Sequence, residues 1–131
     1  MIRFVTLAIL VALCGCLEPS PYHKVTLEWT RKTKLNNNYQ EVLQVAAVYK
    51  SAAWHSAYAE KDAKARGLTG AALDQRLAQA RADAAGPIEI QLLVTTWDRR
   101  ENDLDRGEKS VWRVRLLDAA GTEIKPLELK K

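Results

Sequence analysis

The chain has 131 residues, of which 47% are apolar and 27% charged, and its formal net charge is +4. This length allows one domain of ordinary size and excludes arrays of tandem modules and multidomain enzymes. With four prolines and six glycines, the composition also excludes disordered, collagen-like and low-complexity chains.

Residues 1–15 have the layout of a secretory signal peptide. Arg3 supplies a positive charge, and a largely apolar run follows from Phe4 to Leu13. A membrane-spanning helix needs about 20 apolar residues, so this run is too short to cross a bilayer. A charged start, an apolar stretch of roughly 7–15 residues and a small residue before the cleavage point are typical of export signals.

The end of this segment, Leu13-Cys14-Gly15-Cys16, resembles the lipobox of bacterial lipoproteins, although Cys14 stands where Ala or Ser is more usual. The resemblance implies cleavage before Cys16, a diacylglyceryl group on its sulfur and an acyl chain on its amine. Two or more acyl chains hold a protein stably at a bilayer. Because Leu17 follows in place of Asp, the resemblance implies the outer membrane as destination, with the periplasmic side favoured and the leaflet open.

The two cysteines are both accounted for by this prediction. Cys14 leaves with the signal peptide and Cys16 carries lipid, so the remaining chain has no thiol in an oxidising compartment. Thiol catalysis, thiolate metal sites and disulfides are therefore excluded, and the domain must fold by packing alone.

Residues 16–23 are expected to form the lipidated anchor and a short tether, because two prolines stiffen the segment. A single α+β domain is expected at 24–131. Its first element is a strand from Lys24 to Leu35, in which Val25, Leu27 and Trp29 alternate with polar residues.

The next segment allows two interpretations. Asn36-Asn37-Asn38 predicts a turn. Residues 39–50 alternate as a strand does and contain three valines, yet Asn38 and Glu41 have the spacing of a helix capping box. We favour the strand because Ser51 offers a fresh helix start immediately afterwards.

Residues 51–86 predict a helical hairpin. Ser51 caps the first helix, Gly67 ends it, and Thr69 caps the second. The core stripe of the second helix is formed by Leu73, Leu77, Ala80 and Ala84. The abundance of alanine allows close approach of the two helices but buries little apolar area.

Three further strands are predicted, at Ile88–Trp97, Val111–Asp118 and Thr122–Leu129, with a polar loop at 98–110 and a hairpin turn at Ala119-Ala120-Gly121. The expected fold class is α+β, with an antiparallel sheet or small β-sandwich of about five strands and an inserted helical hairpin. The segment from Asn102 to Pro126 resembles the endings of small uncharacterised bacterial lipoproteins. That resemblance implies no activity.

The polar loop holds a cluster of oxygen-bearing side chains: Asp98, Glu101, Asn102, Asp103, Asp105 and Glu108. A Ca²⁺ site is one interpretation. The spacing fails the EF-hand pattern, because Arg106 stands where Gly is required and Trp112 where the last ligand belongs. Interleaved cations leave the loop nearly neutral, so a solvated loop is favoured.

No catalytic motif is present. His23 and His55 lack zinc-site spacing, no serine lies in a nucleophile elbow, and no glycine-rich phosphate loop occurs. We therefore expect no enzyme, no cofactor and no metal. Most of the four tryptophans fall on packing faces. Trp97, beside the long loop, is the one expected to be exposed, where it could stack on a glycan.

The expected function is that of a non-enzymatic interaction or structural module anchored in the cell envelope. Its candidate partner surface is on the helical hairpin and comprises Trp54, Tyr58, Arg66, Arg76 and Arg81, since aromatic and Arg anchors are enriched at interfaces. The alternative is a small glycan- or lipid-binding module. The expected partners are the membrane, through the lipid on Cys16, and an envelope protein, but not nucleic acid.

Basic residues gather near the anchored end, at Lys24, Arg31, Lys32 and Lys34. Each contact with an anionic membrane surface contributes at most about 1 kcal/mol. A solvated strand face is the favoured interpretation.

Overall fold

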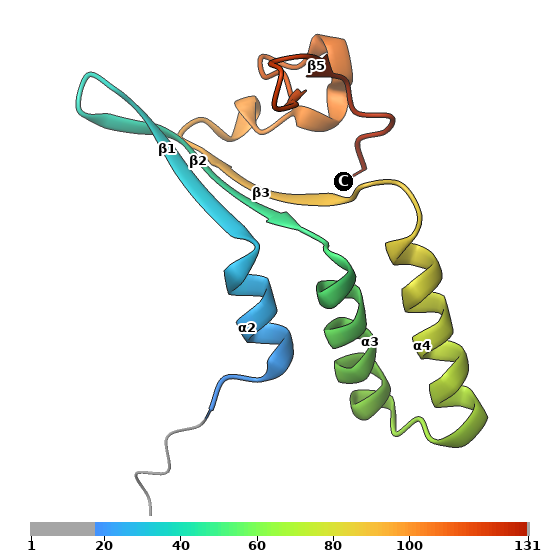
Figure 1. The fold of residues 1–131 in the computed structure, drawn as a ribbon. Helices are drawn as coiled ribbons and strands as arrows, with labels where there is room; N and C mark the ends of the chain where they lie inside the picture. Colours follow the sequence, from blue (N-terminus) through green and yellow to red (C-terminus); the bar gives the residue numbers. More distant parts are fainter. Residues whose placement is uncertain (1–17, 131) are drawn as a thin grey trace, which may run out of the picture. The chain divides into compact units, whose positions relative to one another are not determined.

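The computed structural model describes residues 18–130, so the predicted signal peptide and Cys16 lie outside the described residues. The chain divides into two compact units (Figure 1). The helical unit joins Lys50–Ile88 to the chain that ends at Trp29, and the sheet unit joins Thr30–Tyr49 to the chain from Glu89 onwards. The expected α+β fold class is confirmed. The single domain spanning 24–131 stays a prediction.

Helix α2 (Pro21–Glu28) occupies a segment that was predicted to be a tether followed by a strand. The Ser20 hydroxyl accepts a hydrogen bond from the backbone N–H of His23 at 3.3 Å, and Pro21 stands in the first turn. A Ser N-cap followed by Pro is a strong helix start, and here it outweighs the apolar alternation that follows. The prediction of a strand beginning at Lys24 was wrong, and the expected boundary after His23 falls inside the helix.

Helices α3 (Ala52–Arg66) and α4 (Gly70–Ala84) form the predicted helical hairpin. The Ser51 hydroxyl accepts a hydrogen bond from the backbone N–H of Trp54 at 3.2 Å, as expected for its cap. Gly67 ends α3 in the left-handed conformation, at φ 65°, which Gly adopts without a Cβ clash. The expected side-chain cap from Thr69 is not made.

Small side chains and one aromatic cluster form the interior of the helical unit. Ala57, Ala59, Ala63 and Ala80 are buried, whereas Leu73, Leu77 and Ala84 of the predicted stripe are half-buried. Trp54 is only 6% exposed. Its ring stacks on Tyr58 with centroids 5.1 Å apart and lies 5.6 Å from the ring of Tyr22, which belongs to α2. This cluster joins α2 to α3.

Trp54 is therefore the side chain whose loss should destabilise the helical unit most. Trp54→Ala should lower the free energy of unfolding by about 3–5 kcal/mol, because it leaves a large cavity. Trp54→Phe should cost clearly less, since it keeps an aromatic ring and removes a buried indole N–H that has no partner among residues 18–130. Urea unfolding of both variants tests this, and equal losses would contradict the packing role of the ring.

The sheet unit is built on strands β1 (Thr30–Asn37), β2 (Gln40–Tyr49) and β3 (Ile90–Thr96). They are antiparallel in the order β1-β2-β3 (Figure 1). The strand expected at 39–50 is thus confirmed, and the helical hairpin enters between the second and third strands, as predicted. Strand β2 is the central strand of this sheet.

The β1–β2 connection has two irregular features. Asn38 and Tyr39 both have positive φ, at 47° and 65°, as a tight hairpin turn of the primed type requires. The turn expected at 36–38 therefore lies slightly further along the chain. Leu35 pairs with Leu43 but Asn36 pairs with Glu41, so Val42 is the extra residue of a β-bulge.

Strands β4 (Leu116–Leu117) and β5 (Glu123–Ile124) are much shorter than predicted. The hairpin turn between them is as expected, because the Asp118 carboxylate accepts hydrogen bonds from the backbone N–H groups of Ala120 and Thr122, both at 2.8 Å. These bonds also lower the pKa of Asp118.

The predicted strand at 111–115 is absent, and side-chain bonds to the backbone of the loop 98–110 replace strand pairing there. The Trp112 indole N–H donates to the Glu101 carbonyl at 2.6 Å, and the Arg113 guanidinium donates to the Glu108 carbonyl at 3.0 Å. The alternation of apolar and polar residues in this segment therefore predicted the wrong structure.

Candidate functional site

Two adjacent hollows lie at the end of β3 in the sheet unit. The first, of about 370 Å³, is lined by Val94, Thr95, Thr96, Arg99 and Asn102. The second, of about 270 Å³, is lined by Glu41, Thr95, Thr96 and Trp97. Thr95 and Thr96 line both hollows, so the hollows are neighbours, and we call the two together the β3-end site. Its volumes are near the lower end of the range of about 300–1,000 Å³ found for small-molecule sites.

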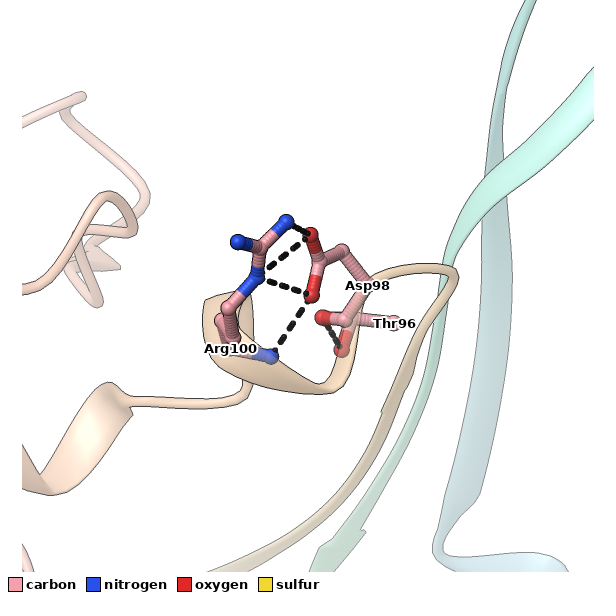
Figure 2. Close-up of polar contacts among 3 residues, drawn as sticks. All are labelled: Thr96, Asp98 and Arg100. Carbon is pink, nitrogen blue, oxygen red and sulfur yellow. Dashed lines mark hydrogen bonds and ion pairs between the residues drawn. The ribbon is translucent and has the colours of Figure 1, made fainter.

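A compact set of polar bonds fixes the turn at this site, as Figure 2 shows. The Thr96 hydroxyl donates to the Asp98 carbonyl at 2.8 Å. The Asp98 carboxylate caps the short 3-10 helix η1 (Arg99–Glu101) by accepting from the backbone N–H of Arg100 at 2.9 Å. The Arg100 guanidinium donates to the same carboxylate, at 2.6 Å from Nη2 and 3.0 Å from Nε. Residues 96, 98 and 100 thus hold one another, and the turn between them is well defined.

Two longer-range bonds connect this turn to the sheet. The backbone N–H of Trp97 donates to the carbonyl of Val42, the bulge residue of β2, at 3.1 Å. The Asn102 side-chain amide donates to the Val94 carbonyl at 3.2 Å. The backbone on both sides of Trp97 and Arg99 is therefore held by β2 and β3.

The ion pair with Arg100 has an electrostatic consequence. Hydrogen bonds from the Arg100 side chain and backbone lower the pKa of Asp98 from 3.8 to about 2. A carboxyl group whose folded pKa is depressed stabilises the fold above its unfolded pKa and loses that contribution as pH falls through its folded pKa. The Asp98 turn should therefore hold at pH 4 and above and open between about pH 4 and pH 2.

NMR titration of the side-chain carboxyl carbons tests this expectation. In the wild-type protein the Asp98 midpoint should be near pH 2, and Arg100→Gln should raise the pKa of Asp98 towards its ordinary value, because it removes the charged donor. An Asp98 midpoint that Arg100→Gln leaves unchanged would show that the ion pair does not hold this turn.

Trp97 and Arg99 are the side chains that the interlocked residues leave available. Trp97 is 73% exposed, which confirms the expectation for this tryptophan. Arg99 is exposed, and no ion pair or side-chain hydrogen bond involves its guanidinium among residues 18–130. Arg99 could not be predicted as a site residue, because nothing in the pair Arg99-Arg100 distinguishes the residue that Asp98 binds.

The rest of the acidic loop is more ordered than the expected solvated loop. It forms η1 and a second 3-10 helix, η2 (Leu104–Lys109). Asp103 is buried and accepts a hydrogen bond from the Ser110 hydroxyl at 2.7 Å. Within the described part of the chain, no group of three or more acidic, His or Cys side chains is arranged to hold a metal ion.

Several residues of the candidate partner surface on the helices contact one another or Asp62 within the helical unit. Arg66 and Arg76 both pair with Asp62, at 2.8 and 2.9 Å, and these bonds lower the pKa of Asp62. The Arg76 guanidinium also lies 5.7 Å from the ring centre of Tyr58.

The five members of this surface therefore differ in accessibility. Trp54 is buried and cannot serve as an exposed anchor. Tyr58, Arg66 and Arg81 are exposed. Arg76 of α4 is half-buried, because it contacts Asp62 and Tyr58 of α3. The helical surface stays a prediction for its exposed members.

The basic residues near the N-terminus divide between the two units. Lys24 belongs to α2, where its ammonium lies 3.8 Å from the Glu18 carboxylate. Arg31, Lys32 and Lys34 are exposed on β1, and Lys34 pairs with Glu41 of β2 at 2.6 Å. Because β1 is an edge of the three-stranded sheet, three cations follow one sheet edge.

No protein-family model matches the chain, and no curated protein or solved structure is significantly similar to it. Between residues 18 and 130, no helix is both long enough and apolar enough to cross a membrane.

Proposed function

We propose that this chain is a lipid-anchored cell-envelope protein that acts as a non-enzymatic interaction module. The lipobox at Leu13–Cys16 supports attachment through lipid on Cys16, and Leu17 after the acceptor favours the outer membrane with the domain facing the periplasm. The observation that carries the interaction role is the basic sheet edge β1. The helical hairpin carries it less well, because Trp54 is buried.

An edge strand presents a row of backbone groups to which a further strand can add. On β1, the exposed cations Arg31 and Lys32 lie along this row, and Lys34 is paired with Glu41 of β2. Like charges opposite one another destabilise strand pairing, so this edge disfavours pairing with a second copy of itself. An extended segment rich in Asp and Glu has the complementary charge. The proposed partner is therefore an envelope protein that contributes an acidic extended segment to β1.

The anchor is tested by metabolic labelling with radioactive palmitate. The wild-type protein should incorporate label and fractionate with the outer membrane, because two or more acyl chains bind a bilayer stably. Cys16→Ala should abolish both results, since it removes the acceptor sulfur. A wild-type protein that takes up no label would overturn the proposed anchor.

The β1 interface is tested by a photo-crosslinking amino acid placed at Thr33 in cells. We expect an adduct whose partner peptide, identified by mass spectrometry, is acidic. Lys32→Glu should reduce the adduct several-fold, because it reverses a charge at the edge. Lys32 pairs in register with Ala46, so this change breaks no ion pair across the strands.

Lys64→Glu is the matched control, since Lys64 is exposed on α3 and lies in the helical unit. It should leave the adduct at the wild-type level. Absence of an adduct, or equal loss in both variants, would contradict the proposed role of β1.

A second candidate function, a glycan-binding module, is favoured by one specific observation, the exposure of Trp97 against the second hollow.

A further inference from the structure

We propose that the β3-end site binds an acidic saccharide, with Trp97 stacking on a sugar ring and Arg99 binding its carboxylate or phosphate. This inference goes beyond the interaction role of β1 and uses other residues. It rests on three observations: the exposure of Trp97, the unengaged guanidinium of Arg99, and the bonds that hold the turn between them.

Trp97 has the properties of a stacking platform. Trp97 is 73% exposed, so its ring presents a large apolar surface to solvent. The ring face is electron-rich, whereas one face of a pyranose presents several C–H bonds that are weakly positive. The two faces are therefore complementary, and the second hollow lies against Trp97.

Arg99 supplies the charge recognition. It lines the first hollow, and its neighbour Arg100 neutralises Asp98, so the nearest carboxylate along the chain is already engaged. Glu41, which lines the second hollow, is likewise paired with Lys34 at 2.6 Å. With both carboxylates engaged, Arg99 contributes net positive charge to the site, and a planar guanidinium suits a carboxylate or phosphate.

The remaining lining groups suit sugar hydroxyls. Thr95 and Thr96 line both hollows, and the Thr96 hydroxyl, which donates to the Asp98 carbonyl, keeps only its acceptor side. The Asn102 amide nitrogen is used by the Val94 carbonyl, which leaves its side-chain oxygen as an acceptor. One apolar ring, one cation and several neutral polar groups around an open hollow match a saccharide with a single acidic group.

The turn is arranged before any ligand binds. The bonds among Thr96, Asp98 and Arg100 in Figure 2, together with the bond from Trp97 to Val42, fix the backbone on each side of the stacking ring. Ordering a loop on binding weakens affinity, so a preformed turn favours binding of a small ligand.

Two acidic saccharides of the envelope share this chemistry. Peptidoglycan glycan carries a lactyl group on every second sugar, and its carboxylate is free where the stem peptide has been removed. Lipopolysaccharide core carries carboxylates and phosphates. The probes are the peptidoglycan disaccharide of N-acetylglucosamine and N-acetylmuramic acid, chitobiose, which lacks the lactyl carboxylate, and purified core oligosaccharide. Titration calorimetry of the full lipidated chain in nanodiscs measures each affinity.

We expect an acidic probe to bind at least about tenfold more tightly than chitobiose. Arg99→Gln should reduce its affinity to that of chitobiose, and Trp97→Ala should abolish binding of both. Tyr39→Asn is the matched control, because Tyr39 is a fully exposed aromatic residue that lines neither hollow and Asn tolerates its positive φ. This control should bind as the wild type does.

Preference for the disaccharide would assign the source to peptidoglycan, and preference for core oligosaccharide would assign it to lipopolysaccharide. Both results support the site. Failure of every probe to bind at millimolar concentration would overturn it, as would binding that survives both Trp97→Ala and Arg99→Gln. A circular-dichroism melt of each variant confirms that a loss of binding is not a loss of folding.

Discussion

Scarcity of large buried apolar side chains is the constraint on which this structure depends. Among the described residues, no large side chain is fully buried, and the buried apolar set is Val48, Trp54 and four alanines. Burial stabilises a fold in rough proportion to the apolar area removed from water. The small buried area therefore does little to determine where helices and strands form. Local polar bonds then decide where elements begin and end. Ser20, Ser51, Asp98 and Asp118 each fix a helix start or a turn through a side-chain acceptor.

This constraint explains which elements could be predicted from the sequence. The helical hairpin was predicted because Ser51 and Gly67 are local signals that act as expected. Helix α2 was missed because Ser20 and Pro21 were interpreted as part of a proline-stiffened tether, and the alternation after them as a strand. The strand at 111–115 was also predicted from alternation alone, whereas Trp112 and Arg113 bond to loop carbonyls and not to a neighbouring strand. Where little area is buried, alternation is a weak guide.

The β3-end site was only half predictable. Trp97 follows a strand and precedes a polar loop, so its exposure could be inferred from its position. The role of Arg99 could not, because Arg99 and Arg100 are chemically identical neighbours. Only the geometry of the Asp98 turn assigns Arg100 to the carboxylate and leaves Arg99 beside the hollow. On the helices, one carboxylate leaves neither of two arginines unpaired, since Asp62 pairs with both Arg66 and Arg76.

The bulge at Val42 divides the β1–β2 hairpin into two segments with different pairing registers. On one side of the bulge, Thr30 to Leu35 pair without interruption with β2, and the same part of β2 pairs with β3. On the other side, next to the turn at Asn38-Tyr39, Asn36 and Asn37 pair with β2 in a register shifted by one residue. The Val42 carbonyl, which receives the Trp97 N–H, lies at this junction. Changes in the length or sequence of the tip can therefore accumulate during evolution without shifting the strand that positions the exposed tryptophan.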